Sequence, residues 1–139
     1  MDGVVVEQKL ESLRRCVSRI QAKCPPAADT LAVDLDLQDI VSLNLSRAVQ
    51  LCVDIGAHLI AGLDVPPPNT MGQTFDLLAQ AHVISAELAL RLKKAVGFRN
   101  IAVHNYDVIN WHIVHSIASS HLDDFSAFAK VVSMRLGAP

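Results

Sequence analysis

One short segment of the chain concentrates the side chains that could do chemistry. Arg99, His104 and Tyr106 place a permanent cation, an imidazole and a phenol within eight residues, shortly after a glycine. The planar guanidinium of arginine binds phosphate oxygens, and histidine, with an unperturbed pKa of about 6.5, exchanges protons near neutral pH. These two groups suffice for metal-free RNA cleavage. The imidazole deprotonates a ribose 2′-hydroxyl or protonates the leaving oxygen, while the guanidinium stabilises charge developing on phosphorus.

The spacing of Arg99 and His104 constrains how they could meet. Each residue of a regular helix turns by roughly 100°, so two positions five apart lie about 140° apart. Convergence on one phosphate therefore requires an irregular helix start after Gly97, a long reach by the arginine, or a site completed across a dimer axis. Asn100 and His104, four apart, share one face. The sequence leaves the three routes open.

The pattern Arg99-x-x-x-x-His104-x-Tyr106, with Phe98 before it and an amphipathic final helix after it, resembles the HepT-like branch of the HEPN superfamily. The resemblance covers about residues 34–128. It implies a small helical homodimer in which two Arg–His motifs face a shared cleft, acting as the metal-independent endoribonuclease of a toxin–antitoxin pair. It also implies that Arg99 and His104 are the catalytic pair, that Asn100 supports them, and that Tyr106 is a modification site.

The same resemblance implies a protein partner beside the RNA substrate. In such pairs an MntA-type nucleotidyltransferase antitoxin neutralises the toxin by binding it or by transferring AMP to the motif tyrosine, here Tyr106. No cofactor is expected. The alternative function is a non-catalytic helical partner of the nucleotidyltransferase, serving as an AMP acceptor or a nucleotide-binding module. A purely structural bundle is a third reading.

Polar residues outside the motif form a second candidate feature. Within the long apolar stretch 34–63, four polar side chains recur at steps of three, four and four, at Arg47, Gln50, Asp54 and His58. Such a stripe is typical of a solvated helix face, but it could equally line a cleft. In the second case Asp54 would support the motif by pairing with Arg99 or orienting His104.

A set of histidines and a basic cluster lie near the motif, and the simplest interpretation of both is a solvated surface. Three histidines follow it, at positions 112, 115 and 121, but no cysteine or carboxylate completes a metal-ligand set with them, so we expect a solvated face and no metal site. Arg91, Lys93 and Lys94 form the only basic cluster close to the motif. This cluster could steer RNA or meet an acidic partner, although such runs are usually only solvated.

Composition sets the fold class in which these residues must be held. The 139 residues are 51% hydrophobic but only 4% aromatic, so the core must consist mainly of leucine, valine, isoleucine and alanine. Such cores are normal for packed helices, and no two-residue alternation suggests a strand. We therefore predict a HEPN-like, all-α fold, a single-domain antiparallel helical bundle of about five helices spanning residues 1–139.

The net charge, the cysteines and the hydropathy limit where the protein can be located and what it can bind. The net charge of −2 argues against attraction of nucleic acid by the whole surface, so any RNA contact must be local. Three cysteines without paired spacing are typical of reduced thiols in a cytoplasmic protein. No signal peptide opens the chain, and its apolar runs are broken before the roughly 18 residues that a membrane span needs.

The predicted helices follow from periodicity, caps and breakers. Proline pairs and triplets end helices at about residues 23 and 63, which gives helices over 5–23 and 34–63. Thr70 or Asn69 caps a helix to about 80, and Ser85 caps one to 96, where Gly97 is a natural stop. Residues 99–106 form a further turn or two. Asp107 or Asn110 caps a last helix, whose apolar stripe runs to 136.

Overall fold

The computed structural model describes residues 3–137, which form seven α-helices and one 3-10 helix. The elements, in chain order, are α1 (Gly3–Lys23), α2 (Ala28–Val33), α3 (Leu35–Ala61), α4 (Met71–Gln80), α5 (Ala86–His104), η1 (Tyr106–Val108), α6 (Trp111–Ser120) and α7 (Asp123–Leu136). No strand occurs in these residues, so the all-α prediction is confirmed.

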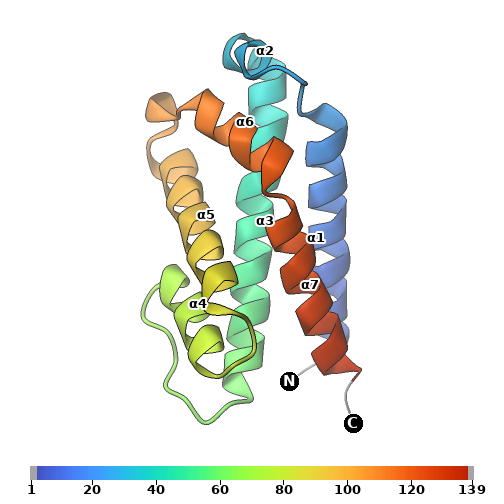
Figure 1. Ribbon diagram of the computed structural model, residues 1–139, viewed down its shortest axis with the longest axis vertical. Helices are drawn as coiled ribbons and strands as arrows, with labels where there is room; N and C mark the ends of the chain where they lie inside the picture. Colours follow the sequence, from blue (N-terminus) through green and yellow to red (C-terminus); the bar gives the residue numbers. More distant parts are fainter. Residues whose placement is uncertain (1–2, 138–139) are drawn as a thin grey trace.

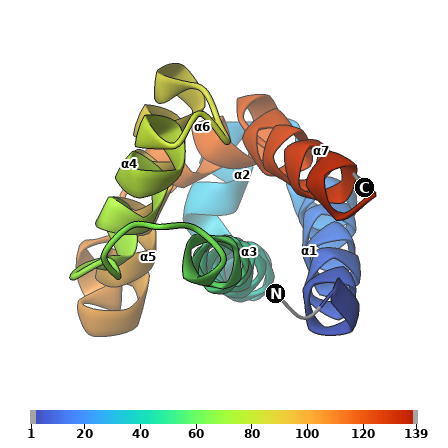
Figure 2. The same cartoon turned by 90° about the horizontal axis from the view of Figure 1, so that it is seen from below.

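Helix α3 is the axis of the molecule. Helices α1 and α3 lie side by side and run in opposite directions, and the remaining helices pack around them (Figure 1). Viewed from below, α3 lies between α1 and the α4–α5 pair, with α7 against α1 (Figure 2). Helix α3 is long and apolar enough to cross a membrane, but 56% of its most apolar stretch is buried by its neighbours. This burial is that of a core helix in a bundle.

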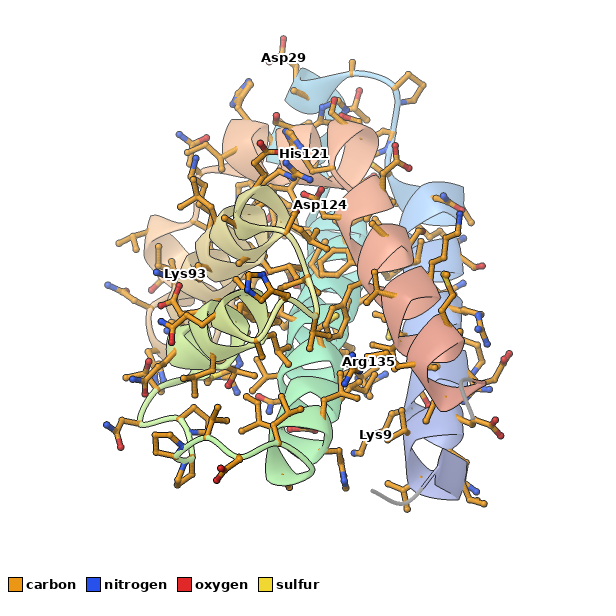
Figure 3. The ribbon with its side chains drawn as sticks, turned by 60° about the horizontal axis from the view of Figure 1, so that its bottom comes forward. Lys9, Asp29, Lys93, His121, Asp124 and Arg135 are labelled. Atoms are coloured by element: carbon orange, nitrogen blue, oxygen red, sulfur yellow. The ribbon has the colours of Figure 1, made fainter. Side chains whose placement is uncertain are left out.

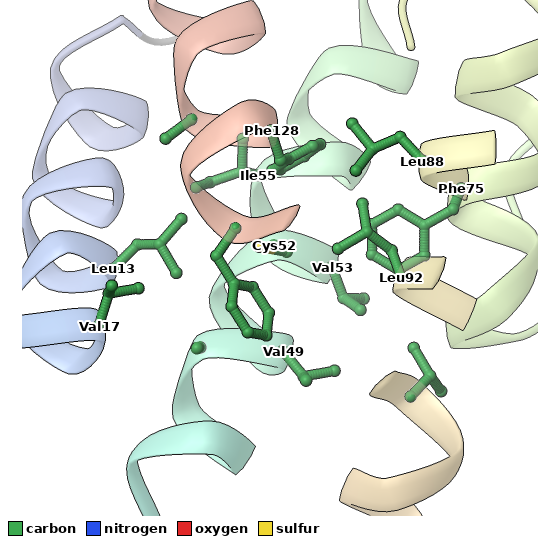
Figure 4. Close-up of a cluster of buried hydrophobic side chains, with 14 of the residues drawn as sticks. Leu13, Val17, Val49, Cys52, Val53, Ile55, Phe75, Leu88, Leu92 and Phe128 are labelled. Atoms are coloured by element: carbon green, nitrogen blue, oxygen red, sulfur yellow. The ribbon is translucent and has the colours of Figure 1, made fainter. Parts of the chain in front are cut away.

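The core joins side chains from five helices. Leu13 of α1, Cys52 of α3, Phe75 of α4, Leu92 of α5 and Phe128 of α7 meet in one apolar cluster (Figure 4). The rings of Phe75 and Phe128 are in edge-to-face contact, with centroids 6.0 Å apart. Each such large apolar side chain contributes about 1.5–3 kcal/mol when it is fully buried. The cluster therefore fixes α4, α5 and α7 against the α1–α3 pair.

Three predicted N-terminal caps of helices are confirmed, and the structure adds a fourth, Asp34, which was not predicted as a cap. Each cap side chain accepts a hydrogen bond from a backbone N–H in the first turn of its helix and so satisfies a donor that has no partner within the helix. The four residues are Asp34 for α3, Thr70 for α4, Ser85 for α5 and Asn110 for α6. Asp34 also follows the last residue of α2, so it joins two helices without an intervening loop.

Three local expectations were wrong. Helix α5 continues through Gly97 and extends to His104. A Cβ atom at Gly97 would meet no other atom within 4 Å. The predicted last helix is two helices, because the chain turns at His121 and Leu122 between α6 and α7. The short helix α2 was not predicted, although its Leu31 is fully buried. The count of about five helices is therefore too low for the described residues.

Helices α3 and α4 approach each other closely at Gly56. A Cβ atom at this position would lie 2.6 Å from Cγ2 of Thr74 and 3.2 Å from Cδ1 of Leu78. Both distances are shorter than ordinary carbon contacts. A side chain at residue 56 would therefore require the side chains of Thr74 and Leu78 on α4 to shift.

Candidate active site

The motif lies at the exposed end of α5 and in the turn that follows it. Arg99 and Asn100 occupy the last two turns of α5, and His104 is its final residue. Asn105 ends the helix, and its backbone N–H donates to the carbonyl oxygen of Ile101. Asn100 and His104 are exposed, whereas Arg99 is half-buried. The structure therefore presents the predicted catalytic groups to solvent on one segment.

Arg99 and His104 do not meet within one chain. Because α5 is a regular helix past Gly97, an irregular start after this glycine is excluded as the way to bring them together. The Arg99 guanidinium instead donates a long hydrogen bond of 3.4 Å to the side-chain oxygen of its neighbour Asn100. No hydrogen bond between Arg99 and His104 occurs in the described part of the chain. Two of the predicted routes to a common phosphate are left: a long reach by the arginine side chain, or a site completed by a second copy of the chain.

Tyr106 is held by contacts from two other elements. Its hydroxyl donates to Oδ1 of Asp39 at 2.9 Å and lies 3.4 Å from Oγ of Ser42, both on α3. Its ring packs edge-to-face against Trp111 at the start of α6, with centroids 5.6 Å apart. The side chain is still 38% exposed. Tyr106 is therefore accessible from solvent and fixed in position at the same time.

This environment raises the pKa of Tyr106 above the usual value of a phenol. Partial burial is the largest cause, because it disfavours the phenolate. The hydrogen bond to the Asp39 carboxylate and the negative charge of that group act in the same direction. The hydrogen bond with Ser42 acts in the opposite direction. The phenol is thus kept protonated and donates to Asp39.

Sequence reasoning missed Asp39 and Ser42. They lie 67 and 64 residues from Tyr106 in the chain, so no local pattern connects them with the motif. The available signal was their spacing of three, which puts a carboxylate and a hydroxyl on one face of an otherwise apolar helix.

Asp54, the predicted supporting residue, has partners elsewhere. Its carboxylate accepts a hydrogen bond from Gln50 at 2.9 Å and lies 3.6 Å from Nζ of Lys9 on α1. Within the described residues of one chain, no hydrogen bond or ion pair joins it to Arg99 or His104. Asp54 therefore pairs with α1, and it has no hydrogen bond or ion pair with the motif in the described part of a single chain.

The basic cluster near the motif is largely neutralised. Nε of Arg91 donates to Asp124 at 2.7 Å, and Nζ of Lys93 lies 3.0 Å from Asp76. Figure 3 shows Lys93 on α5 and Asp124 at the start of α7. In the described part of the chain only Lys94 of this cluster has no such ion pair. These pairs fasten α5 to its neighbours rather than offering a basic surface to RNA.

The three histidines after the motif do not converge. His112 is 2.9 Å from a carboxylate oxygen of Asp29, and His115 is 2.8 Å from the carbonyl oxygen of Pro25. Both contacts tie α6 to α2 and to the loop before it. His121 lies six residues further along, at the junction with α7. Among residues 3–137 no three potential metal ligands come together.

An apolar cavity of about 710 Å³ lies beside the motif, between α5, α6 and the start of α7. Phe98, Ile101 and Ile113 are among its lining residues, but Arg99 and His104 are not. Apolar side chains are also exposed around the turn, with Val103 53% and Val108 61% exposed. The motif thus borders a surface with several exposed apolar side chains.

Comparison with known proteins places this arrangement in context. The sequence profile described as "Ribonuclease HepT-like" matches residues 9–132. The mRNA nuclease HepT of Shewanella oneidensis is 38% identical over 132 residues, which cover 95% of this chain and 98% of that protein. The tRNA nuclease HepT of Aphanizomenon flos-aquae is 24% identical over 136 residues, covering 98% and 92%.

A solved structure gives the same picture. The tri-AMPylated Shewanella oneidensis HEPN toxin, in complex with its MNT antitoxin, superposes with a TM-score of 0.88 at 36% identity. The match covers 96% of this chain and 99% of that one. Sequence and structure therefore agree over nearly the whole length of both chains.

Proposed function

Since this chain belongs to the HepT-like ribonuclease family, we propose that it is the toxin of a toxin–antitoxin pair and cleaves RNA through Arg99 and His104. The observation that carries the proposal is the display of these two groups on the exposed end of one regular helix. A guanidinium and an imidazole in this position can bind a phosphodiester and move its protons. We place this activity in the cytoplasm.

The proposed reaction needs only groups that the chain supplies. His104 accepts the proton of a ribose 2′-hydroxyl, and the 2′-oxygen attacks the neighbouring phosphorus. Arg99 stabilises the charge that develops on the phosphate oxygens. The bond from phosphorus to the 5′-oxygen breaks, and this oxygen takes up a proton. The products are a 2′,3′-cyclic phosphate end and a free 5′-hydroxyl, without a metal ion.

We place this reaction in a homodimer. In one chain Arg99 and His104 point to different sides of α5, whereas a second copy would bring one imidazole to accept the first proton and another to donate the second. The exposed apolar residues Ile101, Val103, Val108 and Ile113 support pairing through this surface, because their burial would favour association.

A cleavage assay in the presence of a metal chelator tests the proposal. The native chain should cleave RNA and leave cyclic phosphate ends, and His104→Ala and Arg99→Ala should each lower the rate at least about a hundredfold. Asn100→Ala should have a smaller effect. His112→Ala is a matched control, because it removes an exposed histidine outside the motif. Full activity of both motif variants would refute the catalytic roles.

A second function is favoured by the accessibility of Tyr106. A nucleotidyltransferase antitoxin would attach AMP to this residue: the phenolic oxygen attacks the α-phosphorus of ATP, and pyrophosphate leaves. The AMPylation of the Shewanella relative supports this proposal. Incubation with the MntA-type partner and ATP should add the mass of AMP to the native chain and not to Tyr106→Phe. Modification without any ribonuclease activity would favour the non-catalytic alternative.

A further inference from the structure

A second concave surface of the molecule lies away from the apolar cavity, between α1 and α3. It is a groove of about 620 Å³. Its walls are two stripes of residues at helical spacing, with Ser12, Arg15 and Arg19 on α1 facing Ile40, Leu43, Asn44, Arg47 and Gln50 on α3. We call this surface the arginine groove.

The arginine groove carries positive charge from three arginines. Among the residues that the structure describes, no carboxylate lines it. Glu11 is bound to Arg14 at 3.1 Å, and Asp54 is bound to Lys9 at 3.6 Å. Within residues 3–137 no ion pair involves the three arginines of the groove. Three guanidinium groups without a carboxylate partner on one surface are notable in a chain whose net charge is −2.

Two of these arginines, Arg15 and Arg47, line the groove together with Cys16, which lies between its two walls. The charges of Arg47 and Arg15 both act to lower the pKa of the Cys16 thiol, against the larger effect of burial, which raises it. Nη2 of Arg15 also donates to Oγ of Ser12 at 3.1 Å, which fixes its orientation. Arginines of α1 and α3 therefore line the same groove from opposite walls.

The groove also has an apolar component. Leu43 is 50% exposed, and Ile40 and Leu51 line the same wall. Arginine forks bind phosphate oxygens in bidentate fashion, and apolar surface beside them suits bases that are not paired in a duplex. This combination fits single-stranded RNA better than a duplex, whose bases are hidden.

Helix α3 connects the arginine groove with the motif. Ile40 and Leu43, at the end of the groove, each follow directly after a residue that contacts Tyr106, namely Asp39 and Ser42. Successive residues of a helix point about 100° apart, so the groove and the contact with Tyr106 occupy adjacent faces of α3. The groove and the motif are thus neighbouring surfaces of one molecule.

We propose that the arginine groove binds the phosphate backbone of single-stranded RNA and guides the strand toward the motif. The choice of RNA over an acidic protein rests on the proposed ribonuclease function. The groove would then contribute affinity for long substrates, and the chemistry would stay with Arg99 and His104.

Binding of a fluorescently labelled RNA of roughly twelve nucleotides tests the proposal. Both proteins to be compared carry His104→Ala, so that cleavage does not interfere. One adds Arg15→Gln, Arg19→Gln and Arg47→Gln. The control instead removes three exposed charges elsewhere, with Lys23→Gln, Lys130→Gln and Arg135→Gln. Circular dichroism and urea unfolding establish that both proteins remain folded.

Each phosphate contact contributes about 0.7 to the slope of log affinity against log salt for a single strand. Loss of about three contacts should therefore weaken binding about 100-fold at about 0.1 M salt. The slope of log affinity against log salt should fall by about 2. In the control, the RNA affinity and the salt slope should change only by the small amount that results from the lower net charge. With native His104, the groove variant should show a higher KM on the long RNA and unchanged cleavage of a dinucleotide, which is too short to reach the groove.

Equal binding by the groove variant and the control would overturn the proposal. The proposal would also be overturned if the groove variant kept its RNA affinity but changed its oligomeric state or its binding to the antitoxin. The groove would then be a protein interface. Failure of the ribonuclease proposal is distinguishable: the native chain would not cleave RNA, while groove-dependent RNA binding would persist and support the groove.

Discussion

The hydrogen bond between Tyr106 and Asp39 should stabilise the native fold by a measurable amount. A hydrogen bond to a charged acceptor contributes about 1.5–3 kcal/mol. The tyrosine is 38% exposed, so water competes for both partners and reduces this to about 1 kcal/mol. Tyr106→Phe and Asp39→Ala should each lower the free energy of unfolding by about this amount. The double variant should lose little more than either single one.

The assay is a double-mutant cycle measured by urea unfolding. Trp111 is the only tryptophan and packs against Tyr106, so its fluorescence reports directly on this part of the molecule. The coupling free energy between residues 39 and 106 should be about 1 kcal/mol. Asp36, an exposed carboxylate one turn earlier in α3, is the matched control and should show no coupling with Tyr106.

A coupling free energy below about 0.3 kcal/mol would refute the reasoning, because independent residues add within that margin. The contact would then not hold the turn to α3, and the fixed position of Tyr106 would have to come from Trp111 alone.

Three further predictions follow from the packing and the pKa shifts. The pKa of Tyr106 is raised in the folded chain, so its contribution to the free energy of unfolding should be complete below about pH 10 and lost as the pH rises through the raised pKa. Near-UV absorbance titration of this sole tyrosine should show the raised pKa. The stability of Tyr106→Phe should lack this pH dependence. Gly56→Ala should destabilise by about 1 kcal/mol, since overpacking outweighs the gain in helix propensity, and should become stabilising beside Thr74→Ser, which removes the clashing methyl group. A thiol reagent should label the half-buried Cys24 in the native protein and the fully buried Cys52 only after unfolding; rapid native labelling of Cys52 would contradict the packing.

Much of the fold was predictable because it depends on local signals. Helix α3 begins and ends within two residues of its prediction, since Asp34 caps it and the triple proline follows it. Glycine costs only about 1 kcal/mol within a helix, so burial of Val96 and Phe98 around Gly97 keeps α5 continuous. The break between α6 and α7 was hidden because both helices turn their apolar faces to the same core.

The candidate site was predictable only in part. The types of Arg99, His104 and Tyr106 were sufficient to suggest the chemistry, and family membership agrees with it. The contact of Tyr106 with Asp39 depends on how α3 and η1 pack, over a separation of 67 residues, and no local pattern encodes it. The arginine groove likewise exists only when α1 and α3 lie side by side.

The central position of α3 has a consequence for how the chain could be divided. Helix α3 contacts every other α-helix of the described chain, and the largely exposed loop 62–70 follows it. A cut in that loop would leave α1–α3 on one fragment and α4–α7 on the other, each with an apolar face that only the other can cover. Asp39 and the arginine groove would belong to the first fragment, and the motif to the second. The protein is thus suited to fragment complementation, in which neither half carries a complete site and reassembly restores it.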